Sequence, residues 1–313
     1  MRDSKEYIKS IQYSVKLKPS HPKPLEKTPT VSGFLQNFPY SASSLDSYLS
    51  CPFKFYYRYV LRVKAKEDNA DLYIGNIVHE ALYKYFQGKT QRTLTENDLN
   101  TGELDLIIAN LFEKRYGQNL PGNVYLLRRQ IRKHLADFIE NYQIPLVRNC
   151  SVEVIHLEHQ INFIKNSYRF FAKLDRVEKR NGRVTIIDYK TSSNKDYLRI
   201  NFNKLDVSIR DTWPDAIGSL QLPVYLLAYS EAEKTCAENI DCLFLLLGMT
   251  ELNDKIEAPL FNNSEEAEEE DAILQTVIWE LLKEITDIDQ PFLPTDKPRD
   301  LCPDCDFRYI CSV

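Results

Sequence analysis

The spacing of apolar and polar positions divides the chain into a helical first half and a second half that mixes strands with helices. Before residue 150, apolar residues recur every three or four positions, which is the period of an amphipathic helix. The spacing predicts helices over 41–50, 72–86, 104–116 and 124–142, and an aromatic-rich core helix over 53–63. The first helix is predicted to be capped by Ser41 or Ser43 and to end before Cys51, because a proline follows that residue.

After residue 150 the pattern becomes richer in β-branched and aromatic residues, which favour strands. The predicted strands are 152–164, 170–177, 184–187 and 239–249, and the predicted helices are 217–229 and 271–288. The last strand is apolar without alternation, so we expect both of its faces to be buried. Helices, three successive strands, a helix and a further strand predict an α/β fold, with a mixed β-sheet core flanked by helices.

An Asn-Gly pair at 181–182 joins two of these strands, and this dipeptide is the strongest short-range signal for a β-hairpin. The hairpin carries Asp175 near the end of its first strand, and Asp188 and Lys190 at the end of its second. Asp188 and Lys190 are two positions apart on one strand, so their side chains share a face of the sheet. Asp175 can reach that face from the partner strand. Two carboxylates and a lysine at one point suit a divalent cation and an anion under attack. A surface ion pair is the alternative, although perturbed acids at the rim of a buried strand tend to be functional.

Composition describes an ordinary water-soluble globular protein of 313 residues, with 43% hydrophobic and 27% charged residues. No apolar run approaches the length of a membrane span, and no apolar secretory signal follows Met1, so we expect a cytoplasmic protein without a membrane partner. The net charge of −5 does not exclude nucleic acid, because a local basic surface can act within an acidic total. The aromatic and basic residues of 53–63 could stack on unpaired bases if they are not core.

Residues 1–40 have few periodic signals and several prolines, so they are predicted to be a flexible arm or linker. Residues 41–313 are predicted to form one domain, with a helical block over about 41–150, a core over about 151–250, and a C-terminal helix plus cysteine segment over about 251–313. The polar stretch 192–215 has no clear period and is expected to be a functional or mobile loop.

The 7 cysteines are an odd number in a chain without a secretion signal, which argues against a disulfide framework. Cys302, Cys305 and Cys311 lie close together near the C-terminus, and Cys51 stands alone far upstream. Four thiolates could hold zinc or an iron–sulfur cube, and an absence of any ligand is the third interpretation. A bound metal centre would clamp the beginning of the domain to its end.

Several motifs resemble those of a known family: Gly75-Asn-Ile-Val-His79, Leu174-Asp175-Arg176, Ile187-Asp188-Tyr-Lys190-Thr191 and Gln221-Leu-Pro-Val-Tyr225. In this order they resemble the RecB-type nucleases of the PD-(D/E)XK superfamily. The cysteine spacing resembles the iron–sulfur branch, which includes AddB-type nuclease domains and CRISPR-associated RecB-type exonucleases. The resemblance covers about Ser41 to the C-terminus. It departs at Ala172, where the family often has Gly, and it has D-x-K in place of the commoner E-x-K.

The resemblance implies a restriction-endonuclease-like fold and a role for each matching residue. Asp175 and Asp188 would bind Mg2+ or Mn2+, and His79 would complete or support that site. Lys190 would orient the attacking water. Gln221 and Tyr225 would line the DNA channel, and Cys51, Cys302, Cys305 and Cys311 would hold a [4Fe-4S] cluster. Without the resemblance, His79 is more often a packed histidine, and Gln221 and Tyr225 an ordinary helix face.

The implied function is a metal-dependent DNA exonuclease that acts on single-stranded DNA ends in DNA repair or recombination. No G-x4-G-K-[ST] motif is present, so a helicase partner is expected to supply any motor activity. The chain could be the nuclease domain of such a helicase–nuclease. The alternative is a catalytically silent DNA-binding scaffold within that complex, which a divalent-cation titration with a nuclease readout would separate from an enzyme.

Overall fold

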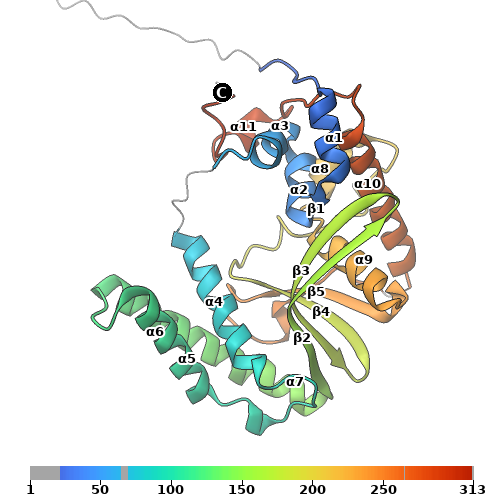
Figure 1. Cartoon of the computed structure of the whole chain (residues 1–313). Coiled ribbons are helices and arrows are strands. Elements are labelled where there is room, and N and C mark those ends of the chain that lie inside the picture. Colours follow the sequence, from blue (N-terminus) through green and yellow to red (C-terminus); the bar gives the residue numbers. More distant parts are fainter. Residues whose placement is uncertain (1–21, 65–69, 264, 312–313) are drawn as a thin grey trace, which may run out of the picture.

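The structure, a computed structural model, describes residues 22–64, 70–263 and 265–311 and has a six-stranded mixed sheet at its centre (Figure 1). The strands are β1 (Pro39–Tyr40), β2 (Val152–Lys165), β3 (Tyr168–Arg180), β4 (Arg183–Lys190), β5 (Ile240–Leu246) and β6 (Glu257–Pro259). β2, β3 and β4 are successively antiparallel, and β5 is parallel to β4. β6 lies at one edge, antiparallel to β5. The predicted mixed sheet is confirmed.

Helices lie on both faces of this sheet (Figure 1). The helices before the long strands are α1 (Pro29–Asn37), α2 (Ala42–Ser50), α3 (Pro52–Phe55), α4 (Ala70–Gln87), α5 (Thr101–Tyr116), α6 (Gly122–Phe138) and α7 (Ile144–Asn149). Those after them are α8 (Trp213–Ala216), α9 (Gln221–Glu233), α10 (Ala267–Thr286) and α11 (Pro298–Leu301). α4 to α6 pack with one face of the sheet, and α9 and α10 pack with the other. The predicted flanking helices are therefore confirmed.

The helix signals in the sequence place most boundaries well. Ser41 caps α2, and its hydroxyl accepts a hydrogen bond from the backbone N–H of Ser44 at 3.3 Å. The predicted core helix over 53–63 is formed by α3 and a π-helical turn, Tyr56–Val60, in which Phe53 and Phe55 are buried. A second π-helical turn, Ile139–Gln143, continues α6 to the predicted end near residue 142.

The predicted hairpin is formed by β3 and β4. Asn181 and Gly182 have φ values of 48° and 87°. Both central residues therefore have the positive φ that a two-residue hairpin loop of type I′ requires. Pairing runs from Arg180 opposite Arg183 to Arg176 opposite Ile187. This register fixes which side chains meet at the far end of the hairpin.

The prediction of a flexible arm over 1–40 is wrong for residues 22–40, and residues 1–21 lie outside the described residues. Thr28 caps α1, which begins with Pro29, and β1 pairs in parallel with β3. Leu35 and Tyr40 are fully buried. The Lys27 ammonium donates hydrogen bonds to the carbonyls of Glu284 at 2.7 Å and Asp287 at 2.8 Å, at the C-terminal end of α10. α1 has nine residues and β1 has two, so neither is long enough to show a clear period in the sequence. Tertiary contacts hold this segment in place.

The long polar stretch 192–215 is mostly irregular, as predicted, and it displaces the start of the following helix. Ile217 pairs with Ile200. A Cβ atom on Gly218 would come within 2.6 Å of the Tyr197 backbone, so only glycine permits this close approach. α9 therefore begins at Gln221 rather than at 217. Among the described helices, none combines the length and the apolar character that a membrane crossing needs.

Candidate active site

The candidate site lies where β3 and β4 separate. Asp175 and Asp188 are the residues just beyond the last backbone pair, Arg176 opposite Ile187. Beyond that pair, the Tyr189 N–H donates to Asp175 Oδ2 at 2.9 Å, so a side chain takes the place of a backbone carbonyl on β3. The hairpin register thus brings the two predicted carboxylates to one place, and a local hydrogen bond fixes one of them.

Asp188 is a buried carboxylate, with 2% of its surface exposed. Its Oδ1 accepts hydrogen bonds from Gln221 Nε2 at 2.7 Å and from the Tyr225 hydroxyl at 3.4 Å. Its Oδ2 lies 2.6 Å from Lys190 Nζ, yet this buried oxygen has no aligned hydrogen bond. The contact is therefore an ion pair without an aligned hydrogen bond. Asp188 Oδ2 therefore retains capacity for another positive partner.

The ionised form of Asp188 is disfavoured by its surroundings. Burial and the neighbouring Asp175 carboxylate raise the pKa of Asp188 to about 6, although Lys190 and His79 act in the opposite direction. A bound divalent cation would reverse this balance, because it would favour the ionised form. Burial beside a second carboxylate thus makes a cation a favourable partner for Asp188.

His79 reaches the site from α4. Its Nε2 donates to the Tyr189 carbonyl at 3.0 Å, and its Nδ1 lies 3.3 Å from Asp175 Oδ2. Neighbouring ligands of an octahedral ion with bonds of about 2.1 Å are about 3 Å apart, so this spacing suits two ligands of one cation. Burial lowers the pKa of His79, but Asp175 and Asp188 raise it more, so the net pKa is raised.

Gln221, the first residue of α9, connects the lysine to the buried acid. Its Oε1 accepts from Lys190 Nζ at 2.6 Å, and its Nε2 donates to Asp188 and, at 2.6 Å, to the Tyr225 hydroxyl. Burial is the main reason that the pKa of Tyr225 is raised, so this hydroxyl stays protonated. The amide orientation is set by these partners, because one end faces a donor and the other faces acceptors.

Asp46 on α2 positions the beginning of α9 and was not predicted. Its Oδ1 accepts the Leu220 N–H at 2.7 Å, and its Oδ2 accepts the Ser219 hydroxyl at 2.9 Å. Burial raises the pKa of Asp46 to about 6 in spite of these bonds. No local pattern could have identified it, because its partners lie more than 170 positions away in the sequence.

Glu158 is a second residue that the sequence did not indicate. One ligand atom from each of His79, Glu158 and Asp175 can be chosen so that all three lie within 4.8 Å of one another. Glu158 has φ of 50°, which is uncommon for a residue with a side chain, and it forms an ion pair with Lys173. The register of β2 with β3 puts Glu158 opposite Asp175, and Gln160, two positions on, lines the same cleft.

All six predicted catalytic residues line one open cleft of about 900 Å³. They are His79, Asp175, Asp188, Lys190, Gln221 and Tyr225. Glu158, Lys173, Tyr83 and Tyr197 also line it. The structure therefore brings the predicted set together, while the role assigned to each residue stays a prediction.

The four cysteines proposed as cluster ligands also come together. Cys51 lies between α2 and α3, and the other three follow α11, which lies beside α3 (Figure 1). All are free thiols and half-buried. Burial and the nearby Cys51, Cys305 and Cys302 raise the pKa of Cys311 to about 11. Four thiols from opposite ends of the domain are thus close enough to interact electrostatically.

Comparison of structures agrees with this fold. A solved structure from Eubacterium rectale, named "Putative exonuclease", has a TM-score of 0.50 to this chain at 13% sequence identity and covers 90% of each chain. At this identity the likeness concerns the fold alone. It places the chain among α/β proteins built as a mixed sheet between helices.

Residues 39–312 match the family described as the PD-(D/E)XK nuclease superfamily, and the chain belongs to it. An ATP-dependent helicase/deoxyribonuclease subunit from Clostridium perfringens (strain SM101) is 25% identical over 226 residues, which are 64% of this chain and 18% of that protein. The protein of the same name from Clostridioides difficile is 25% identical over 264 residues, 75% of this chain and 21% of that protein. The chain thus spans about a fifth of the length of these relatives.

Proposed function

We propose that this chain is a metal-dependent deoxyribonuclease that removes nucleotides from single-stranded DNA ends during repair or recombination. The observation that carries the proposal is the buried Asp188, whose Oδ2 lacks an aligned hydrogen bond beside Asp175, His79 and Lys190. A nuclease needs a cation and a fixed positive charge at one phosphate, and these residues are suited to hold the first and supply the second.

His79 and Asp175 offer a ring nitrogen and a carboxylate oxygen at the spacing of neighbouring ligands, and Asp188 adds a second carboxylate whose charge interacts with both, so the three fit Mg2+ or Mn2+. Such a cation, when bound, supplies Lewis-acid polarisation of the phosphate and a more acidic water. Asp188 and Gln221 fix the Lys190 ammonium on two sides, each at 2.6 Å. Lys190 then stabilises the negative charge that develops on the attacked phosphate.

Two tyrosines at the cleft support a single-stranded substrate. Tyr83 and Tyr197 both line it, and Tyr197 has 47% of its surface exposed. Exposed aromatic rings stack on unpaired bases without sequence preference. The relatives are named as helicase/deoxyribonuclease subunits, so we propose a helicase as the partner that delivers the strand.

We also propose that Cys51, Cys302, Cys305 and Cys311 hold a [4Fe-4S] cluster. Cys302 and Cys311 each interact electrostatically with Cys51, so thiols from both ends of the domain lie near one another. A cube of this kind is held by four thiolates, and these four residues supply them.

Replacing Cys305 with serine is expected to remove the cluster, because a cube of this kind needs four thiolates. The measurement is iron and sulfide content, together with visible absorbance, of anaerobically purified protein. The control is Cys236→Ser, which changes an exposed thiol elsewhere. Stoichiometric zinc without iron in the unaltered protein would disprove the cluster and leave the proposed nuclease site untouched.

Gln221→Leu is expected to weaken Mn2+ binding or cleavage about 10- to 100-fold, as loss of a residue that orients a metal ligand typically does. The leucine keeps the volume but cannot bond to Asp188 or Lys190. Mn2+ titration and kcat at saturating Mn2+ would be measured. Gln275→Leu, which loses a bond to Asp271 on α10, is the matched control and is expected to change neither.

The raised pKa of Asp188 predicts a pH-dependent stability in metal-free protein. The folded state holds this proton more tightly than the unfolded state, so the contribution is complete below the ordinary pKa of 3.8 and is lost as pH rises through about 6. Two pKa units correspond to about 3 kcal/mol. Urea unfolding at pH 4 and pH 8 should show that Asp188→Asn removes much of this difference. An equal difference in wild type and variant would contradict the assignment.

The nuclease activity is tested with end-labelled single- and double-stranded DNA, Mn2+ and anaerobically purified protein. We expect progressive shortening of the single strand that chelation abolishes. Binding without cleavage under any divalent cation would instead identify a silent DNA-binding scaffold.

A further inference from the structure

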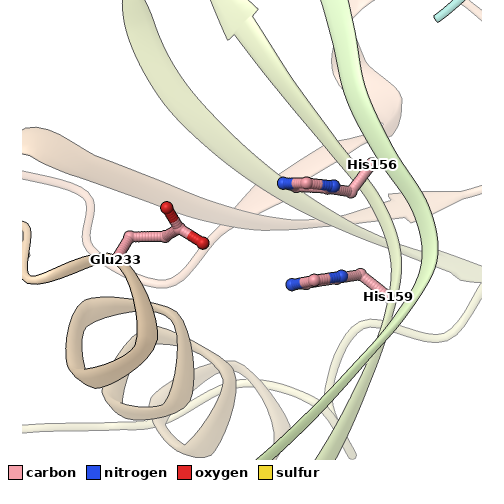
Figure 2. Close-up of side chains that lie close together, drawn as sticks. All are labelled: His156, His159 and Glu233. Carbon is pink, nitrogen blue, oxygen red and sulfur yellow. The ribbon is translucent and has the colours of Figure 1, made fainter.

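A second cluster of possible metal ligands lies at the opposite end of α9 from Gln221. It consists of His156 and His159 on β2 and Glu233, the last residue of α9 (Figure 2). One ligand atom from each of these residues can be chosen so that all three lie within 4.8 Å of one another. The two imidazole rings are stacked, with centroids 4.2 Å apart and an angle of 13° between their planes. The carboxylate faces the ring edges that point away from the strand (Figure 2).

An irregularity in β2 lies between the two histidines. Residues three apart on a regular strand lie on opposite faces. Here Glu158 has φ of 50°, so the strand does not alternate regularly from His156 to His159. Glu158 lies between the two histidines in sequence and lines the active-site cleft instead. The same distortion therefore sends an acid to one site and an imidazole pair to the other.

The three side chains lack other partners among the described residues. Neither histidine ring, nor the Glu233 carboxylate, forms a hydrogen bond or an ion pair within that part of the structure. Burial and the adjacent His156 lower the pKa of His159, although Glu233 opposes this. Neutral imidazole is the form that binds a metal, because its nitrogen lone pair is free.

The geometry points to a binding site for Zn2+ or a chemically similar transition-metal ion, held by His156, His159 and Glu233. Two imidazole nitrogens and one carboxylate are a zinc-type ligand set, with the fourth position left for water, whereas Mg2+ prefers oxygen ligands alone. Ligand atoms of a tetrahedral zinc ion lie about 3.4 Å apart, and the three atoms here lie within 4.8 Å of one another. Glu233 is exposed, so its side chain has room to adjust to an ion.

Such an ion would join β2 to the C-terminal end of α9. The first residue of the same helix, Gln221, contacts Lys190 and Asp188. The site would thus stabilise both the distorted segment that carries Glu158 and the helix that orients the lysine. It does not depend on the proposed nuclease function, because its ligands are distinct from the catalytic set.

The test is the number of Zn2+ ions bound by the full chain in equilibrium dialysis. Glu233→Gln and His159→Asn are expected to reduce affinity for one ion at least tenfold, whereas Glu231→Gln should not. The last variant removes the same charge from the same helix but affects an ion pair with Lys165. Co2+ substitution distinguishes zinc bound at the cysteines from zinc bound at the histidines. Only a thiolate site gives a strong sulfur-to-cobalt charge-transfer absorption. Unchanged binding in every variant would overturn the proposal.

A second measurement uses the unaltered chain and does not depend on variants that fold. Carbethoxylation of histidines, followed by mass spectrometry, reports which rings are accessible. We expect Zn2+ to protect His156 and His159, and Mg2+ at the same concentration to leave them reactive. Equal reactivity with and without Zn2+ would show that the pair is a packed stack without a metal.

Discussion

Lys190→Ala is expected to slow phosphodiester cleavage about 100- to 1000-fold, the usual loss when one group that stabilises transition-state charge is removed. The ammonium is held at 2.6 Å from both Asp188 Oδ2 and Gln221 Oε1, so it occupies one fixed position at the cleft. Lys190 is not among the proposed metal ligands. Its loss should therefore affect the rate far more than Mn2+ affinity or DNA affinity.

The measurement is single-turnover cleavage at saturating protein, beside separate titrations of Mn2+ and DNA. Lys283→Ala, which removes an exposed charge from α10, is the control and should cleave as wild type does. Asp188→Ala should also abolish cleavage while DNA binding persists. Cleavage at the wild-type rate in Lys190→Ala would contradict the assigned role.

The second large effect is on stability, and Glu178→Ala is expected to cost about 3–5 kcal/mol in the free energy of unfolding. Glu178 and Arg176 form an ion pair with 0% and 1% of their side-chain surface exposed. Arg180 also donates to Glu178 at 2.6 Å. Truncating the carboxylate leaves the buried Arg176 guanidinium without its compensating charge, whereas Arg180 keeps an ion pair with Glu257. The Arg176 guanidinium lies over the Phe86 ring at 4.2 Å and has no route to water.

Urea unfolding of the variant should be compared with Arg183→Ala. That control breaks an ion pair with Asp241 in which both side chains are more than 40% exposed, and it should cost at most about 1 kcal/mol. A double replacement, Arg176→Met with Glu178→Leu, should recover part of the loss, because it removes both buried charges. Equal costs for Glu178→Ala and Arg183→Ala would show that the buried network contributes little.

Local chemistry explains which parts of the site could be predicted from sequence. The Asn-Gly turn fixes the hairpin register, and the register alone brings Asp175 opposite Asp188. Periods of two and 3.6 residues likewise place the long strands and helices. Both the turn signal and the periodicity act over a few residues, so they can be recognised in the sequence alone.

The missed features depend on contacts between distant segments. Asp46 meets α9 from α2, and α1 and β1 are held by packing rather than by periodicity. Glu158 joins the cleft through the pairing of β2 with β3, which the pattern of one strand does not show. β6 has three residues, too few for alternation to be visible. Tertiary structure rather than local propensity determines each of these.

The central claim is that Asp175, Asp188 and His79 converge on one cation next to Lys190. Anomalous diffraction from crystals soaked in Mn2+ tests it most directly. We predict a manganese peak within bonding distance of both carboxylates and His79, and no such peak in Asp188→Asn crystals. Manganese bound only elsewhere, with these three side chains making no contact to it, would contradict the claim.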